Sequence, residues 1–247
     1  LVLANPTFGT LVSENSLGFT WALNSRLMKL TPFENDTVSD NRGERLYLRI
    51  RGKIYDLING SAAVFSSDKA EYHAKINDIT AVTTVTVPEK GMVKHINIKF
   101  NTESTCEAEV AFYCEPVLGE SAKFSFLLKS AWNDHRLVIG NTFDQNKNGF
   151  LCLDEKNGCD GFTCDRASFF AGRWNDRILS PCGSNCACIR KSFSLYGGRE
   201  IELEFSIGYG ETAESAAFAC RNFYELPDHS QAPVAKLDDL PYAILFN

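Results

Sequence analysis

Glu200-Ile201-Glu202-Leu203-Glu204-Phe205-Ser206-Ile207 decides the fold, because apolar and polar residues alternate through this stretch without a break. Successive side chains of a β-strand point to opposite faces, so the pattern puts the four hydrophobic residues on one face and the polar residues on the other. It predicts a strand with one buried and one wet face, which is the usual situation in an antiparallel sheet.

The same alternation recurs along the chain. It runs through Ile96, Ile98 and Phe100 in residues 93–100, and again through residues 107–114. Asn-Gly and Gly-Gly pairs between such runs supply the positive φ angles that tight hairpins need. About fifteen short strands with few helices predict an all-β fold, a large two-sheet antiparallel β-sandwich. The other strand candidates are Phe8–Ser13, Gly18–Ala22, Arg45–Ile50, Lys53–Ile58, Ala62–Phe65, Glu71–Ile76, Ala81–Val87, Lys123–Ser130, Arg136–Thr142, Phe150–Leu153, Ala167–Phe170 and Ile189–Leu195.

One segment departs from the strand pattern. Residues 211–225 are rich in helix formers and repeat small apolar residues at helical spacing. We therefore expect a sandwich domain over residues 1–210, followed by a linker helix and tail over residues 211–247.

Composition excludes several classes of partner. The net charge is −6 and no run of five like charges occurs, so neither nucleic acid nor an anionic membrane is expected. No apolar run is long enough to cross a bilayer. The nine cysteines are an odd number, which favours reduced thiols and a cytoplasmic location.

Two patterns suggest metal sites, and we expect neither to bind metal. Residues 144–155 fit a calcium-loop pattern, from Asp144 to Glu155, but strand-like flanks favour a hairpin turning at Asn148-Gly149. Cys182, Cys186 and Cys188 lack the paired spacing of structural zinc sites. Hydrolase, nucleotide and metalloprotease motifs are also missing, so we assign no catalytic residue, metal or cofactor.

The candidate binding segment is the polar loop of residues 21–40. Aromatic rings can stack on sugar faces, while amide, carboxylate and guanidinium groups can pair with vicinal hydroxyls. An ordered connection whose polar side chains serve only its own backbone explains the loop equally well. The candidate carbohydrate- or interface-binding residues are Trp21, Asn24, Arg26, Phe33, Asn35, Asp36 and Asp40.

The first forty residues carry a family resemblance. Residues 3–14, 18–22, 24–26, 30–32 and 35–40 resemble the N-terminal domain of glycoside hydrolase family 94, closest to its cyclic β-1,2-glucan synthases. Residues 164–173, 180–182 and 205–208 extend the resemblance, which covers residues 1–225. The segments 182–188 and beyond Pro227 depart from the family pattern.

The resemblance implies a super-sandwich of the galactose mutarotase-like type, joined by a linker helix to an (α/α)6 barrel. In the family that barrel holds the general-acid Asp and the phosphate site, so this chain alone is expected to be inactive. The implied role is a non-catalytic module of a β-glucan phosphorylase or glucan synthase, with weak contact to β-glucan or oligosaccharide. The implied protein partner is the helical catalytic domain, and a homodimer is a further option. A free-standing carbohydrate-binding protein and a purely structural dimerisation domain remain alternatives.

Overall fold

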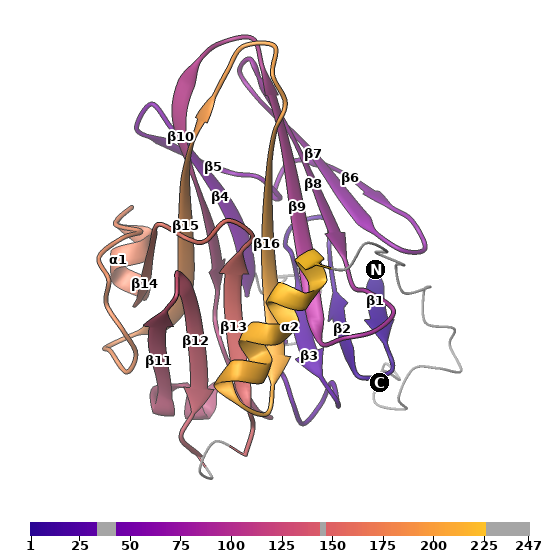
Figure 1. Cartoon of the computed structure of the whole chain (residues 1–247), viewed down its shortest axis with the longest axis vertical. Helices are drawn as coiled ribbons and strands as arrows, with labels where there is room; N and C mark the ends of the chain where they lie inside the picture. The colour runs from indigo at the N-terminus through magenta and orange to yellow at the C-terminus, as the bar shows by residue number, and fades with distance from the viewer. Residues whose placement is uncertain (34–42, 144–146, 226–247) are drawn as a thin grey trace.

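The computed structural model describes residues 1–33, 43–143 and 147–225. Within them, sixteen strands form three antiparallel sheets, with two short helical segments and one longer helix (Figure 1). The predicted all-β sandwich is therefore confirmed. In this part of the chain, no helix is both long and apolar enough to cross a membrane.

The larger face of the sandwich is an eight-stranded sheet with strand order β11-β12-β13-β16-β9-β8-β7-β6. Its strands are β6 (Ala62–Phe65), β7 (Ala70–Ile76), β8 (Ile79–Thr86), β9 (Val93–Thr102), β11 (Leu128–Asn133), β12 (Arg136–Asn141), β13 (Phe150–Glu155) and β16 (Ile201–Gly210). The alternating residues 201–207 lie at the centre of this sheet, in β16 between β13 and β9.

The opposing face is a five-stranded sheet with strand order β14-β15-β10-β4-β5. Its strands are β4 (Glu44–Ile50), β5 (Lys53–Asp56), β10 (Cys106–Cys114), β14 (Gly161–Asp165) and β15 (Asn185–Leu195). A third sheet, absent from the two-sheet prediction, contains β1 (Val2–Asn5), β2 (Phe8–Leu11) and β3 (Phe19–Ala22).

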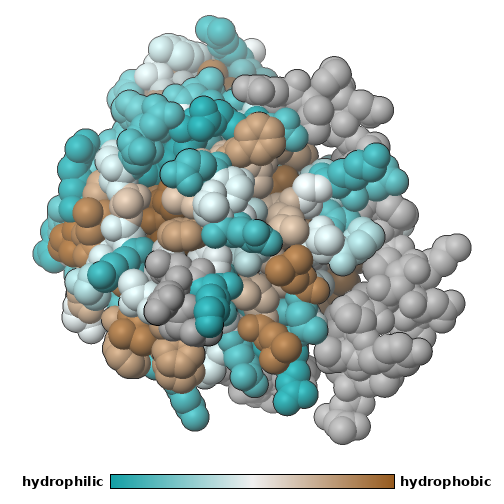
Figure 2. All heavy atoms as spheres, turned by 60° about the horizontal axis from the view of Figure 1, so that its bottom comes forward, coloured by the Kyte–Doolittle hydropathy of each residue, from teal (hydrophilic) through white to brown (hydrophobic). Residues whose placement is uncertain are grey.

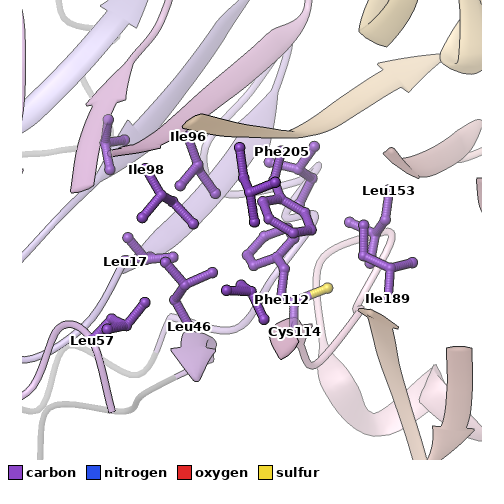
Figure 3. Packing of buried hydrophobic residues seen from close by; sticks show 14 of the residues in the cluster. Leu17, Leu46, Leu57, Ile96, Ile98, Phe112, Cys114, Leu153, Ile189 and Phe205 are labelled. Carbon is purple, nitrogen blue, oxygen red and sulfur yellow. The ribbon is translucent and has the colours of Figure 1, made fainter. Parts of the chain in front are cut away.

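The main core fills the space between the two large sheets (Figure 3). Ile96, Ile98 and Phe205 of the larger sheet point toward Leu46 and Phe112 of the smaller one, and all five are fully buried. The ring centroids of Phe112 and Phe205 lie 6.4 Å apart. These are the apolar positions that period-two alternation predicts, so hydrophobic burial directs the stacking of the sheets.

The helix predicted over residues 211–225 is confirmed as α2 (Ala213–Glu225), which lies across the outer face of β13 and β16 (Figure 1). Two strand predictions are wrong. Residues 167–170 belong to the helix α1 (Arg166–Phe170), because the Asp165 side chain caps it by accepting the N–H of Ser168. The 3-10 helix η1 (Ala122–Leu127) replaces most of the strand predicted over residues 123–130.

Candidate functional site

Four of the seven candidate site residues, Trp21, Asn24, Arg26 and Phe33, lie in the described part of the chain. Asn35, Asp36 and Asp40 lie outside the described residues. The described portion of the loop follows β3 at the lower end of the sandwich in Figure 1, where α2 also begins.

Trp21 is a packing residue within β3, because only 5% of its surface is exposed. Its ring stacks against Phe19 with 5.2 Å between centroids, and Phe19 in turn stacks on Phe33 at 4.9 Å. On the neighbouring strand, a Cβ added to Gly9 would lie 2.4 Å from the Trp21 ring, so the glycine makes room for the indole. The buried ring cannot be an open stacking platform for a sugar. Phe33, which is 38% exposed, is the member of this stack nearest to solvent.

Asn24 shapes the turn that follows β3. Its Oδ1 atom accepts the backbone N–H groups of Arg26 and Leu27, both at 3.0 Å. Leu23 has a φ of 59° at the start of this turn. The turn exposes the Arg26 side chain and leaves Leu23 51% and Leu27 55% exposed.

A buried polar cluster holds the first part of the loop. Thr20 and Thr31, which bracket residues 21–30, each donate a hydroxyl to Oε1 of Glu44 at 2.6 Å. The other carboxylate oxygen, Oε2, pairs with Lys94 Nζ at 2.7 Å, and both charged side chains are 0% exposed. Lys94 also donates to the Thr10 hydroxyl at 3.0 Å. The cluster therefore joins the three-stranded sheet to the five-stranded and the eight-stranded sheets.

The sequence patterns did not single out Glu44 and Lys94, although alternation puts both on core-facing positions. Lys94 shares a strand face with Ile96 and Ile98, and Glu44 shares one with Leu46 and Leu48. Burial lowers the pKa of Lys94, and the carboxylate of Glu44 opposes that shift. Two opposite charges at core-facing positions can neutralise each other only if the strands bring them together.

A cavity of about 460 Å³ lies beside the turn, between the β8–β9 connection and α2. Its apolar lining includes Leu23, Pro88, Met92, Tyr209 and Phe218. Phe218 projects from α2 and is 61% exposed. Figure 2 shows hydrophobic groups interspersed with hydrophilic ones over this end of the molecule. We name Leu23, Leu27 and Phe218 the apolar rim.

A second groove, of about 380 Å³, lies on the other flank of α2. Charged side chains are more frequent in its lining, among them Lys129, Arg136 and Arg221. Arg136 is already engaged by Asp154 at 2.7 Å and by Asp134. The helix therefore forms a ridge between two grooves, of which the second has more charged residues.

Polar contacts fix the last turn of α2 on the sheet. The hydroxyl of Tyr224 donates to Ser206 Oγ at 2.9 Å, while the Phe223 ring stacks on His95 with 4.3 Å between centroids. His95 Nε2 lies 3.0 Å from Glu204 Oε2. This hydrogen bond is the main reason that the pKa of Glu204 falls to about 2, although burial opposes the shift.

The cysteine-rich region contains free thiols. Burial raises the pKa of Cys114, Cys164, Cys186 and Cys188, which favours the protonated form over the thiolate that a metal needs. Across residues 1–33, 43–143 and 147–225, no group of three or more metal-ligating side chains comes together. The start of the calcium-like pattern, residues 144–146, lies outside the described residues.

Comparison with known proteins places this architecture in a family. The chain is 25% identical over 240 residues to the cyclic β-(1,2)-glucan synthase NdvB of Rhizobium meliloti (strain 1021), in an alignment that covers 84% of this chain and 8% of the relative. The chain thus corresponds to a small part of that protein.

Solved structures share the fold at low sequence identity. A putative kojibiose phosphorylase from the human microbiome superposes with a TM-score of 0.52 and 8% identity, covering 91% of this chain and 32% of the other. A bacterial glucoamylase complexed with acarbose gives 0.52 and 10%, covering 92% and 35%. A putative aldose 1-epimerase from Escherichia coli K12 gives 0.50 and 8%, covering 85% and 98%.

The sequence profile of the glycosyl hydrolase 94 supersandwich domain matches residues 1–225, which is the whole β-sandwich together with α2. The chain therefore belongs to the glycosyl hydrolase 94 family, of which it forms the supersandwich domain.

Proposed function

We propose that this chain is a non-catalytic module of a β-glucan phosphorylase or cyclic β-1,2-glucan synthase, and that it packs against a helical catalytic domain. Family membership and the relationship to a glucan synthase support the class of parent enzyme. The general acid and phosphate site implied by the family belong to the helical barrel, so the module itself is expected to release no glucose 1-phosphate.

The apolar rim is the observation that carries the docking proposal. Leu23 and Phe218 line the cavity and are 51% and 61% exposed, and Leu27, in the same turn as Leu23, is 55% exposed. Grouped apolar side chains on a surface mark an interaction site more often than scattered ones do. Phe218 belongs to α2, which is the last element of the described chain.

Carbohydrate contact is the second part of the proposal, and the loop geometry makes it weak. Trp21 is removed from solvent by its own packing, which leaves Arg26 and the partly exposed Phe33 as the described groups able to reach a glucan. Of these two, only Arg26 can form hydrogen bonds with a sugar, and each of them competes with water. A free-standing carbohydrate-binding protein would need a stronger site than this.

A reconstitution experiment tests docking. The chain is mixed with the helical domain encoded by the same gene, and co-purification and phosphorolysis or transglycosylation are measured. Leu27→Asp and Phe218→Asp should weaken association and lower activity, since a charge would be buried in an apolar contact. Tyr196→Asp is the matched control, because Tyr196 is 46% exposed in the β15–β16 hairpin at the opposite end of the sandwich.

The outcomes separate the candidate roles. If both rim variants associate with the helical domain as tightly as the wild type does, docking through the rim is refuted. Phosphorolysis by the isolated chain would refute a non-catalytic module. Tight binding of β-1,2-glucooligosaccharides by the isolated chain would favour the free-standing carbohydrate-binding protein.

A further inference from the structure

The chain contains three Asn-Gly pairs, at residues 59–60, 148–149 and 157–158. Such a pair loses ammonia readily, because the glycine nitrogen can attack the asparagine side chain and glycine has no Cβ to obstruct the approach. The reaction needs an asparagine side chain that is free to turn back on the main chain, and a glycine N–H that no acceptor holds. These two requirements distinguish pairs that are identical in sequence.

Asn157-Gly158 is held by its turn. The Gly158 N–H donates to the carbonyl of Glu155 at 2.7 Å, so the attack would have to break this hydrogen bond. Lys191 Nζ donates to the carbonyl oxygens of both residues of the pair, at 3.3 and 2.6 Å. A Cβ added to Gly158 would lie 3.1 Å from His135 Cβ. This turn therefore has little freedom to rotate.

Asn148-Gly149 is held through its side chain. Asn148 Nδ2, the nitrogen that would leave as ammonia, donates to the carbonyl of Leu118 at 3.0 Å. A Cβ added to Gly119 would lie 2.9 Å from the same atom. Gly149 is buried, and a Cβ added to it would lie 2.6 Å from the carbonyl oxygen of Gly210. Both the leaving group and the attacking residue are fixed.

Asn59-Gly60 meets both requirements. The two residues occupy the exposed centre of a turn, which the Ser61 N–H closes by donating to the carbonyl of Ile58 at 3.1 Å. Gly60 has a φ of 85°, and no atom beyond its chain neighbours lies within 4 Å of an added Cβ. Within the described part of the chain, neither the Asn59 side chain nor the Gly60 N–H has a hydrogen-bond partner.

We propose that Asn59 is a site of spontaneous deamidation in the folded chain, with solvent water as the co-reactant. The Gly60 nitrogen loses its proton and bonds to Asn59 Cγ, while the Cγ–Nδ2 bond breaks and ammonia leaves with a proton. Water then opens the resulting succinimide at either carbonyl, which gives aspartate or isoaspartate at position 59. Both products carry one new negative charge. The proposal is independent of the docking function, because it concerns no residue of the apolar rim.

The two products should affect the fold differently. The turn joins β5 to β6, which are the end strands of the two large sheets, and it follows the buried residues Leu57 and Ile58. Isoaspartate routes the main chain through an additional methylene carbon, so the hydrogen bond between Ser61 and Ile58 cannot keep its geometry. Aspartate leaves the backbone unchanged. The isoaspartyl form should therefore be the less stable of the two.

Peptide mapping by mass spectrometry of the folded full chain, aged in water enriched in heavy oxygen, tests the proposal. Asn59 should take up the label severalfold faster than Asn148 or Asn157, and the rate should rise with pH because the attacking nitrogen must lose a proton. In concentrated urea all three asparagines should react at similar rates, because the contacts that hold the other two pairs are lost.

Two variants complete the experiment. Asn59→Gln should abolish labelling at this position, since glutamine would have to form a larger ring, and its melting temperature should equal that of the wild type. Asn59→Asp reproduces the charge without the lengthened backbone, so an aged wild-type sample that contains isoaspartate should melt below it. Labelling of Asn148 or Asn157 as fast as Asn59 in the folded chain would refute the assignment. An Asn59 that reacts only in urea would refute it as well.

Discussion

Lys94 Nζ lies 2.7 Å from Glu44 Oε2 in the interior, and neither side chain has any exposed surface. Thr20 and Thr31 saturate the second carboxylate oxygen, and Thr10 accepts a further hydrogen bond from the ammonium group. A buried ion pair is tolerable when the remaining donors and acceptors are satisfied in this way. The pair and its threonine partners join three sheets, and Thr20 and Thr31 bracket residues 21–30 of the loop.

Breaking this pair from one side should be strongly destabilising. Lys94→Met leaves a buried carboxylate without its cation, so we expect a loss of about 3 to 5 kcal/mol in the free energy of unfolding. The double variant Lys94→Met, Glu44→Leu removes both charges and should lose much less. Urea denaturation of Lys94→Met, Glu44→Leu and the double variant forms a double-mutant cycle. A loss in the double variant equal to the sum of the two single losses would show that the two groups do not act as a pair.

Alternation predicted the sandwich from the sequence because burial on one face of a sheet imposes period two on each strand. Glu44 and Lys94 have the same parity as the core-facing residues of their strands, but their pairing depends on sheet stacking, which local patterns do not encode. Ala167–Phe170 was misassigned because its apolar residues suit a strand, while the side chain of Asp165 caps a helix. Trp21 could be placed on a strand, yet its burial depends on Gly9 of the neighbouring strand.

The hydrogen bond between His95 and Glu204 predicts a specific dependence of stability on pH. The pKa of Glu204 is lowered from 4.5 to about 2 in the folded chain, mainly by His95. The unfolded chain therefore binds more protons between these values, and the stabilisation is complete above 4.5 and lost as pH falls toward 2. The difference in unfolding free energy between wild type and Glu204→Gln should therefore shrink as the pH falls from 4.5 toward 2.

Urea unfolding at a series of pH values measures this difference. Glu200→Gln is the control, since Glu200 is 51% exposed and lies 3.7 Å from Lys99 Nζ. We expect little change for that variant, as surface ion pairs contribute little. A wild-type advantage over Glu204→Gln that persists unchanged at the lowest pH would contradict the assignment.

The close contact of α2 with the sheet should depend on Gly208. A Cβ at this position would lie 2.7 Å from Cys220 Sγ and 3.1 Å from the carbonyl oxygen of Ala216. Gly208→Ala should therefore push the helix away from β16 and cost about 1 to 3 kcal/mol. Gly183→Ala is a matched control, because no atom lies within 4 Å of its added Cβ. Hydrogen exchange of the α2 amides should rise in the first variant only; unchanged protection would mean that the helix accommodates the methyl group.

The loop variants should separate a structural role from a binding role. Trp21→Ala removes a ring that is 5% exposed and packed on Phe19 and Gly9, so we expect a loss of about 3 to 5 kcal/mol. Asn24→Ala removes two hydrogen bonds that shape the turn and should cost about 1 kcal/mol. Arg26 is exposed, so Arg26→Ala should leave stability almost unchanged.

Denaturant melts rank the three variants, while glucan titration and association with the helical domain are measured on those that remain folded. A defect in either interaction for Arg26→Ala, at wild-type stability, would identify the guanidinium as a contact group. Normal interactions in that variant would instead leave the described part of the loop as a scaffold held by Trp21 and Asn24.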